Sequence, residues 1–198
     1  MNVQNIGIIE TGAGNLTSLE AAVARIGLTP RRLKQPTLDG IDQLIIPGQG
    51  RFGPVMKTLS NAGWLDVLKG WFIREKPLLG ICVGLQVLFE ASEEDSNIAG
   101  LSILPGVVRR LQSPKQPMMG WAPVRFNKAL QTLNGDAYFV NSFVVTESDN
   151  AIAYTDYGQR FVAALRVGSW TACQFHPEKS GAYGERLLRQ WLRSETVA

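Results

Sequence analysis

The 198-residue sequence predicts one α/β domain, residues 1–198, with three α/β/α layers around a mixed, mostly parallel sheet. Three observations support this prediction. The length fits one domain with a substantial core. In the first half, strand-like segments alternate with amphipathic segments, which is typical of parallel strands joined by helical crossovers. In the second half, strand-like segments follow one another with few helices between them, so some of these strands should pair antiparallel.

The first half predicts four strands and three helices. An apolar stripe at Leu16, Leu19, Val23 and Ile26 indicates the first helix, and Thr17 with Glu20 forms a capping-box pattern at its start. Gly27 suits the end of that helix. The strands are expected at residues 6–9, 29–33, 43–46 and 78–81, and the helices at about 15–26, 64–72 and 84–91.

The second half predicts six strands and a closing helix. Its apolar segments are short and separated by turn-forming residues rather than by long amphipathic segments. The strands are expected at residues 107–111, 122–126, 137–145, 151–155, 161–167 and 170–175, and the helix at about 182–192.

The composition excludes several classes of protein. Twenty basic and 17 acidic residues leave a net charge of +3, too small a surplus to indicate nucleic-acid binding. One histidine and two cysteines cannot assemble a four-ligand zinc site, and no metal or other cofactor is expected. The longest apolar run, residues 78–89, is too short to cross a bilayer, and the first five residues carry no basic region. We therefore expect a cytoplasmic protein with reduced cysteines and no membrane contact.

The sharpest local signal is Gly80-Ile81-Cys82-Val83-Gly84, between a predicted strand and a predicted helix. This pattern is a nucleophile elbow with cysteine in place of serine. So tight a turn needs neighbours without side chains two positions away, and Gly80 and Gly84 meet that need. Cys82 would lie at a helix N-terminus, which favours a thiolate, and the Val83 N–H would face a developing oxyanion. The alternative is a buried cysteine at a close strand–helix crossing.

The second signal surrounds the only histidine, within the segment from Gln174 to Lys179. His176 follows an apolar strand that Pro177 ends, and Glu178 comes two residues later. His176 can therefore act as the base for Cys82, with Glu178 orienting the imidazole. A lone histidine is more often structural than catalytic, but its neighbours and its uniqueness reverse that preference here.

Glycine-rich segments follow two other predicted strands. Pro47-Gly48-Gln49-Gly50-Arg51-Phe52-Gly53 can present backbone N–H groups to an oxyanion, although an ordinary glycine turn would have the same sequence. Because the carboxyl ends of parallel strands converge, this loop and Cys82 should share one site. Gly12-Ala13-Gly14 resembles a dinucleotide-binding loop but has Thr17 where the third glycine belongs, so no nucleotide site is expected.

Together these motifs resemble the triad glutamine amidotransferases. Within that family the similarity is greatest to the glutaminase subunits of imidazole glycerol phosphate synthase, an enzyme of histidine biosynthesis, and it extends over nearly the whole chain. The cysteine and histidine segments resemble the family as a whole. The likeness to this type of subunit rests on the opening loop at residues 12–16, the loop at 47–53 and Met119-Gly120-Trp121.

The resemblance implies a triad glutamine amidotransferase fold and a Cys82–His176–Glu178 triad that hydrolyses glutamine to glutamate and ammonia through a cysteine thioester. The ammonia would pass to a separate cyclase subunit of (β/α)8-barrel type, with which the chain would form a heterodimer. The resemblance also implies three groups of binding residues: Gly48, Gln49, Gly50 and Val83 for the oxyanion; Gln86, Glu94 and Ser142 for the substrate; Trp121 and Lys179 for the partner.

The sequence departs from the family pattern at four places. Glu10-Thr11 stands where the family usually has Asp-Tyr, and Gln49 stands where it has valine. The segment from Met118 to Ala122 replaces His-Met-Gly-Trp-Asn, and Asn141-Ser142-Phe143 replaces His-Ser-Tyr. None of these positions belongs to the triad, but all are expected near the glutamine pocket or the partner face.

Three alternatives stay open beside this function. A paralogous glutaminase subunit could serve another synthase, such as one for surface-sugar amidation. A non-catalytic module could keep the fold and only bind a partner, although the intact triad argues against it. A cysteine peptidase of similar fold is a weaker alternative, which the opening loop and the oxyanion pattern oppose.

Overall fold

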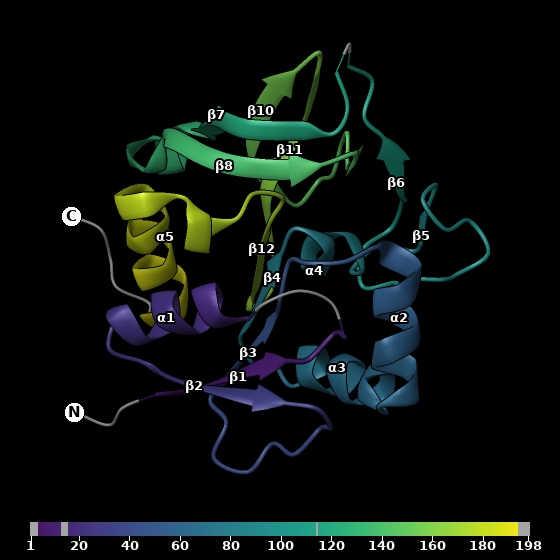
Figure 1. Ribbon diagram of the computed structural model, residues 1–198, viewed down its shortest axis with the longest axis vertical. Helices are drawn as coiled ribbons and strands as arrows, with labels where there is room; N and C mark the ends of the chain where they lie inside the picture. Colours follow the sequence, from purple (N-terminus) through teal and green to yellow (C-terminus); the bar gives the residue numbers. More distant parts are fainter. Residues whose placement is uncertain (1–3, 13–15, 114, 194–198) are drawn as a thin grey trace.

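The computed structural model describes residues 4–12, 16–113 and 115–193. Within these residues, a nine-stranded sheet runs through the molecule in the order β2-β1-β3-β4-β12-β11-β10-β7-β8 (Figure 1). The first five strands in this order are parallel, as the alternating first half of the sequence predicts. They are β2 (Thr29–Leu33), β1 (Asn5–Ile9), β3 (Gln43–Ile46), β4 (Leu78–Ile81) and β12 (Trp170–Cys173).

The other half of the sheet is antiparallel, so the predicted mixed sheet is confirmed. Its strands are β11 (Gln159–Val167), β10 (Ala151–Tyr157), β7 (Met118–Phe126) and β8 (Gly135–Asn141). A small second sheet lies beside it, made of β5 (Ala91–Ser92), β6 (Val107–Arg110) and β9 (Phe143–Val144).

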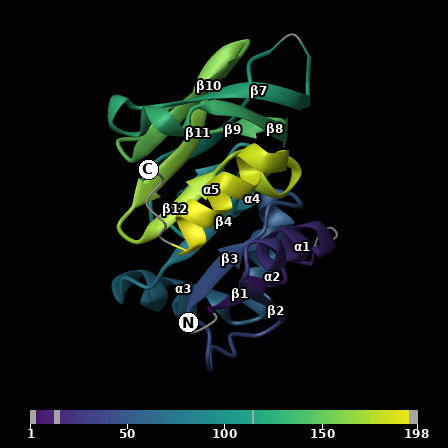
Figure 2. The same cartoon turned by 90° about the vertical axis from the view of Figure 1, so that its left-hand side faces the viewer.

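Helices cover both faces of the parallel half, which confirms the three layers. One face carries α1 (Thr17–Arg25) and α5 (Gly181–Arg193), which lie in front of the sheet in Figure 2. The other carries α2 (Phe52–Asn61) and α3 (Trp64–Ile73), while α4 (Val83–Gln86) follows β4 directly. Two short 3-10 helices complete the elements of the described residues, η1 (Lys128–Leu133) and η2 (Pro177–Lys179).

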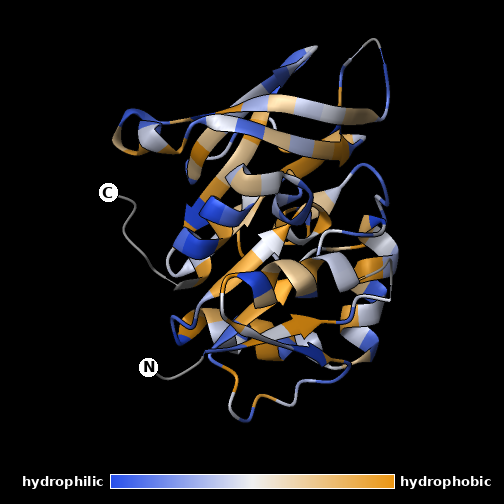
Figure 3. Cartoon of the chain, turned by 60° about the vertical axis from the view of Figure 1, so that its left-hand side comes forward, coloured by the Kyte–Doolittle hydropathy of each residue, from blue (hydrophilic) through white to orange (hydrophobic). Residues whose placement is uncertain are grey.

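The two faces have separate apolar cores, because successive strand residues point to opposite sides of a sheet. Ile45 packs into the core beneath α1 and α5, whereas its neighbours Leu44 and Ile46 pack into the core beneath α2 and α3. Figure 3 shows the result: the central strands are mainly hydrophobic, and the helices carry both kinds of residue. Both faces of these strands are therefore buried, as expected for a parallel sheet.

Two predicted elements differ from the structure because of contacts distant in sequence, and one helix of the structure is not among the predictions. The helix expected at 84–91 ends at Gln86, since the next four carbonyl groups accept hydrogen bonds from a returning segment, residues 100–104. The strand expected at 137–145 breaks at Ser142, whose carbonyl accepts from Leu111 N, and β9 pairs with β6 instead. Helix α2 is not among the predicted elements, because the glycine-rich segment indicates only a loop. Its Pro54 lies in the first helical turn, where proline is tolerated.

The start of the first helix also differs from the prediction. Helix α1 begins at Thr17 with Leu16 at the N-cap position and no side-chain cap from that residue. Both carboxylate oxygens of Glu20 instead accept from the Arg32 guanidinium, at 2.6 Å each. The predicted capping box is therefore wrong. Residues 13–15 of the opening loop lie outside the described part of the chain.

Candidate active site

Three neighbouring parallel strands bring the main predicted site residues together. Gly48 follows β3, Cys82 follows β4 and His176 follows β12, and these strands are adjacent in the sheet. A Cβ atom added to Gly48 would lie 2.9 Å from Cys82 Cβ and 2.9 Å from His176 Cε1. The glycine therefore allows close approach of the loop to both side chains, and the predicted convergence of these segments is found.

Cys82 lies at a strained turn between β4 and α4. Its φ of +48° lies in a region that residues with a side chain rarely adopt, and its N–H donates to Cys173 O at 2.7 Å. A Cβ on Gly80 would lie 2.6 Å from Gly84 O, and one on Gly84 would overlap the Ile46 carbonyl. Both glycines are thus required sterically, as expected for a nucleophile elbow.

The imidazole of His176 is oriented by Glu178. Its Nδ1 lies 2.8 Å from Glu178 Oε1, and the two side chains are only 4% and 5% exposed. The backbone of His176 is held as well, because its N–H donates to Tyr138 O at 2.9 Å and its carbonyl accepts from Ser180 Oγ at 2.7 Å. The ring therefore has a fixed position, with its other nitrogen available to Cys82.

The electrostatics of the site favour a charged imidazole. Burial alone would lower the pKa of His176, but the negative charge on Cys82 and the Glu178 carboxylate outweigh burial and raise that pKa from 6.5 to about 10. His176 is therefore protonated at neutral pH.

A small cavity of about 170 Å³ has Cys82 in its lining. It is smaller than the roughly 300–1,000 Å³ of pockets for drug-sized ligands, so it suits a ligand of few heavy atoms. Gly50 lines it with a φ of +118°, a conformation open mainly to glycine. The other lining residues are Cys82, Val83, Gln86, Glu94, Pro117, Val140, Asn141, Ser142 and Phe143.

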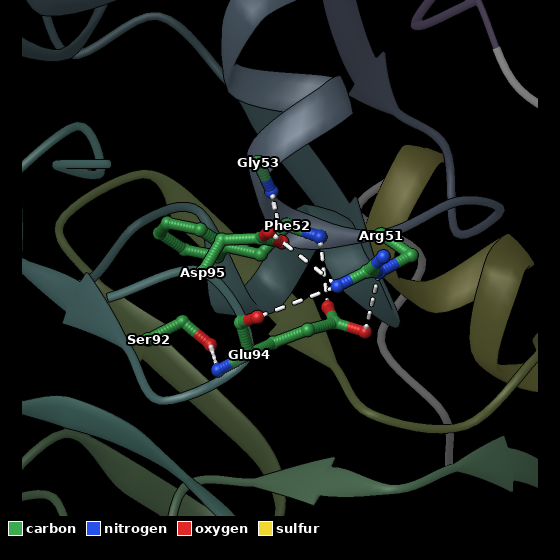
Figure 4. Close-up of polar contacts among 6 residues, drawn as sticks. All are labelled: Arg51, Phe52, Gly53, Ser92, Glu94 and Asp95. Atoms are coloured by element: carbon green, nitrogen blue, oxygen red, sulfur yellow. Dashed lines mark hydrogen bonds and ion pairs between the residues drawn. The ribbon is translucent and has the colours of Figure 1, made fainter. Parts of the chain in front are cut away.

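An acidic pair fixes the loop that carries Gly48 and Gly50 (Figure 4). Glu94 Oε2 accepts from the Phe52 N–H, and Asp95 Oδ2 accepts from the Gly53 N–H, both at 2.9 Å. These amides belong to the first turn of α2, where N–H groups lack intrahelical acceptors and favour negative charge. Arg51 bridges the two carboxylates, at 3.4 Å from each. We call Glu94 and Asp95 the acidic clamp.

Gln86 is buried with both N–H donors of its amide in use. Its Nε2 donates to Phe143 O at 3.0 Å and to Gln174 Oε1 at 3.1 Å. Gln86 can therefore contact a ligand in the cavity only through its carbonyl oxygen, as an acceptor. Gln174 was not singled out by sequence reasoning, although a glutamine inside an apolar strand two residues before the histidine could have indicated it.

The predicted partner residues lie on the surface next to the triad, outside the cavity. Trp121 on β7 is 58% exposed and packs edge-on against Tyr138, with ring centroids 6.1 Å apart. Met119, two residues earlier on the same strand face, is 64% exposed. Lys179 is exposed, and its N–H donates to His176 O at 3.0 Å. Gln49 is half-buried between the two glycines of the loop.

The described residues contain no group of three or more His, Cys, Asp or Glu side chains placed to hold a metal ion. Among the same residues, no helix has both the length and the apolar character needed to cross a membrane.

The family comparisons agree with one another. Residues 8–194 match the model for the family described as glutamine amidotransferase class-I. "Imidazole glycerol phosphate synthase subunit HisH" of Synechococcus sp. (strain CC9902) is 41% identical, covering 95% of this chain and 93% of that protein. The protein of the same name from Desulfitobacterium hafniense is 39% identical, covering 97% of each.

One plant relative is much longer than this chain. "Imidazole glycerol phosphate synthase hisHF, chloroplastic" of Arabidopsis thaliana is 35% identical over 98% of this chain, but the match covers only 35% of that protein. Among solved structures, one titled as the crystal structure of a glutamine amidotransferase has a TM-score of 0.78 at 21% identity, covering 95% of this chain and 97% of that one. This likeness concerns the fold.

Proposed function

Because the chain belongs to the class-I glutamine amidotransferase family, we propose that it hydrolyses glutamine with Cys82, His176 and Glu178 and supplies ammonia to imidazole glycerol phosphate synthase in histidine biosynthesis. The observation that carries the proposal is the approach of Gly48 to both Cys82 and His176, beside a cavity of small-molecule size. The relatives named for that synthase match nearly the full chain and so favour this function over the alternatives.

The first chemical step is attack by the Cys82 thiolate on the side-chain amide carbon of glutamine. The C–S bond forms, the carbonyl π electrons move to oxygen, and a tetrahedral oxyanion results. Collapse of that intermediate breaks the C–N bond, and the proton held by His176 passes to the leaving nitrogen to give ammonia. The raised pKa of His176 ensures that this proton is present at neutral pH.

Backbone N–H groups of two segments stabilise the oxyanion in this proposal. Val83 is the first residue of α4, directly after the nucleophile, and Gly50 lines the cavity on the opposite loop. Gly48, Gln49 and Gly50 belong to the loop that the acidic clamp holds at its far end. Loss of one oxyanion donor typically lowers kcat by roughly 10²–10³-fold.

Hydrolysis of the γ-glutamyl thioester completes the cycle. Neutral His176, with Glu178 at its Nδ1, removes a proton from water as the water oxygen attacks the thioester carbon. The second tetrahedral intermediate breaks its C–S bond, which releases glutamate and restores the thiolate–imidazolium pair. Each proton that His176 gives in the first half is therefore recovered in the second.

The α-ammonium group of glutamine is the part that Gln86 and Glu94 suit. Gln86 has only a carbonyl oxygen to offer, and Glu94 offers a carboxylate; both are acceptors and both line the cavity. Ser142 lines the same cavity where the β8 strand ends, and we assign it to the amino-acid end of the substrate as well.

The ammonia acceptor is a separate cyclase subunit of (β/α)8-barrel type, which forms a heterodimer with this chain. Support comes from the exposed apolar residues Met119 and Trp121 beside the triad, a combination often found at interfaces. In the longer plant relative, this chain corresponds to about a third of one protein. Lys179 is exposed and directly follows Glu178 of the triad.

The two cysteines, Cys82 and Cys173, form no disulfide, which fits the reducing cytoplasm.

A glutaminase assay of the chain with its cyclase and the cyclase ligand tests this function. Glutamate release should fall at least about 10³-fold in Cys82→Ser, because a serine hydroxyl is far harder to ionise than a thiol. Cys173→Ser is the matched control, since Cys173 is fully buried and forms no part of the triad. Turnover retained in Cys82→Ser would exclude Cys82 as the nucleophile, and growth of a histidine auxotroph carrying this chain would confirm the pathway.

A further inference from the structure

We propose that Gln174 is a positioning residue that donates a hydrogen bond to the Cys82 sulfur and stabilises its thiolate. The inference deepens the proposed function, because it concerns the same cysteine. Gln174 Nε2 lies 3.4 Å from Cys82 Sγ, and the residue is fully buried. Its backbone is fixed by a bond from its own N–H to Ala163 O at 2.9 Å, so the side chain starts from a rigid strand end.

The direction of this hydrogen bond follows from the contacts behind it. Phe143 O is a backbone carbonyl and can only accept, so the group of Gln86 that lies 3.0 Å from it must be the NH2. The same NH2 lies 3.1 Å from Gln174, which must therefore present its carbonyl oxygen there. The NH2 of Gln174 is left facing the sulfur.

The opposite orientation of the Gln174 amide would be unfavourable toward both Cys82 and Gln86. Rotating Gln174 would place its carbonyl oxygen against the sulfur and its NH2 against the NH2 of Gln86. A buried donor that faces a donor, or an acceptor that faces an acceptor, bears the full desolvation penalty without gaining a hydrogen bond. One orientation of the amide therefore dominates. The Phe143 carbonyl thus fixes the orientation of the Gln86 amide, which in turn fixes that of Gln174. As a result, Gln174 presents a hydrogen-bond donor to Cys82.

A neutral donor complements the histidine chemically. His176 loses its proton to the leaving ammonia and regains it from water, so its charge changes during the cycle. The Gln174 amide keeps its N–H throughout and remains available when the thiolate is expelled from the second tetrahedral intermediate. Gln174 therefore favours the thiolate both as nucleophile and as leaving group, without touching glutamine.

The test is the pH dependence of Cys82 alkylation by iodoacetamide, measured without glutamine. Removing the donor in Gln174→Leu should move the midpoint of the rate profile upward by about 1–2 pH units, the worth of a hydrogen bond to a charged group. Gln174→Glu, which keeps the shape but replaces the donor with an acceptor, should move it further. Gln86→Met should move it less, because Gln174 remains but loses its orientation. Cys82→Ser gives the background labelling.

A matched control separates this role from packing. Gln43 is also buried, and its amide donates to Leu192 O. It is the first residue of β3 and so lies at the end of that strand opposite to the Gly48 loop. Gln43→Leu should cost comparable stability and leave the alkylation midpoint unchanged. In the glutaminase assay, Gln174→Leu should lower kcat about 10-fold or more with little change in KM.

Unchanged midpoints in folded Gln174→Leu and Gln174→Glu would overturn the proposal, as would equal shifts in Gln43→Leu. If Gln174→Leu does not fold, Gln174→Glu and Gln86→Met decide in its place. An absence of glutaminase activity in the wild-type complex would instead contradict the proposed function, and the alkylation midpoints would still report on Gln174.

Discussion

The Nδ1 atom of His176 lies 2.8 Å from the Oε1 atom of Glu178, and neither side chain is more than 5% exposed. An ion pair so fully removed from water depends strongly on both charges being present, because either charge alone would be costly there. The second carboxylate oxygen of Glu178 is buried without a hydrogen-bond partner, which makes the carboxylate rely on the imidazolium. The pair therefore links the stability of the protein to pH.

Glu178→Gln tests this link. Burial lowers the pKa of His176 in the folded protein, but Cys82 and Glu178 together raise it from 6.5 to about 10. The interaction of protonated His176 with Glu178 therefore contributes its full stabilisation of the fold below about pH 6.5. That stabilisation is lost as the pH rises through the folded value. The free-energy difference between wild type and Glu178→Gln, measured by urea unfolding at pH 6, 8 and 10, should shrink with increasing pH.

Glu20→Gln provides the control for that titration. Its Arg32 partner lowers the pKa of Glu20, and neither group titrates between pH 6.5 and 10. The effect of this substitution should therefore be constant across the range. A constant difference for Glu178→Gln as well would contradict the assigned role of the buried pair.

Gly84→Ala should destabilise the protein by about 1–3 kcal/mol, the usual cost of overpacking. The added Cβ would collide with the Ile46 carbonyl, which belongs to a central strand and cannot move freely. Gly70→Ala lies within helix α3, where the nearest atoms are the flexible end of Arg74 at 3.3 Å. That control should stabilise the protein by up to about 1 kcal/mol. Urea denaturation of both variants measures the contrast, and equal effects would contradict the steric account of the turn.

Asp95→Ala should loosen the loop at residues 47–53. It removes the acceptor for the Gly53 N–H and one ion pair to Arg51, which should cost about 1 kcal/mol of stability. We expect kcat to fall more than KM rises, because Asp95 holds the loop that we propose to bind the oxyanion and does not itself line the cavity. Glu93→Ala is the control, since Glu93 contacts Arg109 and Arg110 on β6 instead. If Asp95→Ala lowered stability but left kcat unchanged, the acidic clamp would have no role in positioning the loop for catalysis.

Trp121→Ala should weaken binding to the cyclase by at least about 30-fold, as expected for a tryptophan at the centre of an interface. Ile73→Ala is the matched control, because Ile73 is 79% exposed at the end of α3, away from the triad. Isothermal titration calorimetry with the cyclase distinguishes the two variants. Similar affinities for both would show that the partner binds elsewhere.

Much of this structure could be predicted from local sequence. The parallel strands and the elbow follow from short apolar runs and two glycines, and the convergence of Gly48, Cys82 and His176 follows from strand adjacency. The acidic clamp could not be predicted in the same way. Glu94 and Asp95 contact amides 42 residues earlier, and helix α2 itself begins inside a segment whose glycines indicated only a loop.

The chain of hydrogen bonds that joins Gln86, Gln174 and Cys82 could not be predicted for a similar reason. The family resemblance implies Gln86 only as a substrate residue, but its NH2 also donates to Phe143 and Gln174, which leaves its carbonyl oxygen to contact a ligand. Phe143 reaches it because the expected strand at 137–145 breaks at Ser142. Such a break depends on pairing with β6, which local patterns do not encode.

The single imidazole of this chain, buried against Glu178, gives the molecule a built-in spectroscopic reporter. In an NMR spectrum of protein labelled with ¹⁵N-histidine, every ring signal belongs to His176, so tautomer and charge can be assigned without mutagenesis. Docking of the cyclase or formation of the thioester would each change that one set of resonances. The state of the reaction centre can thus be followed directly in the assembled complex.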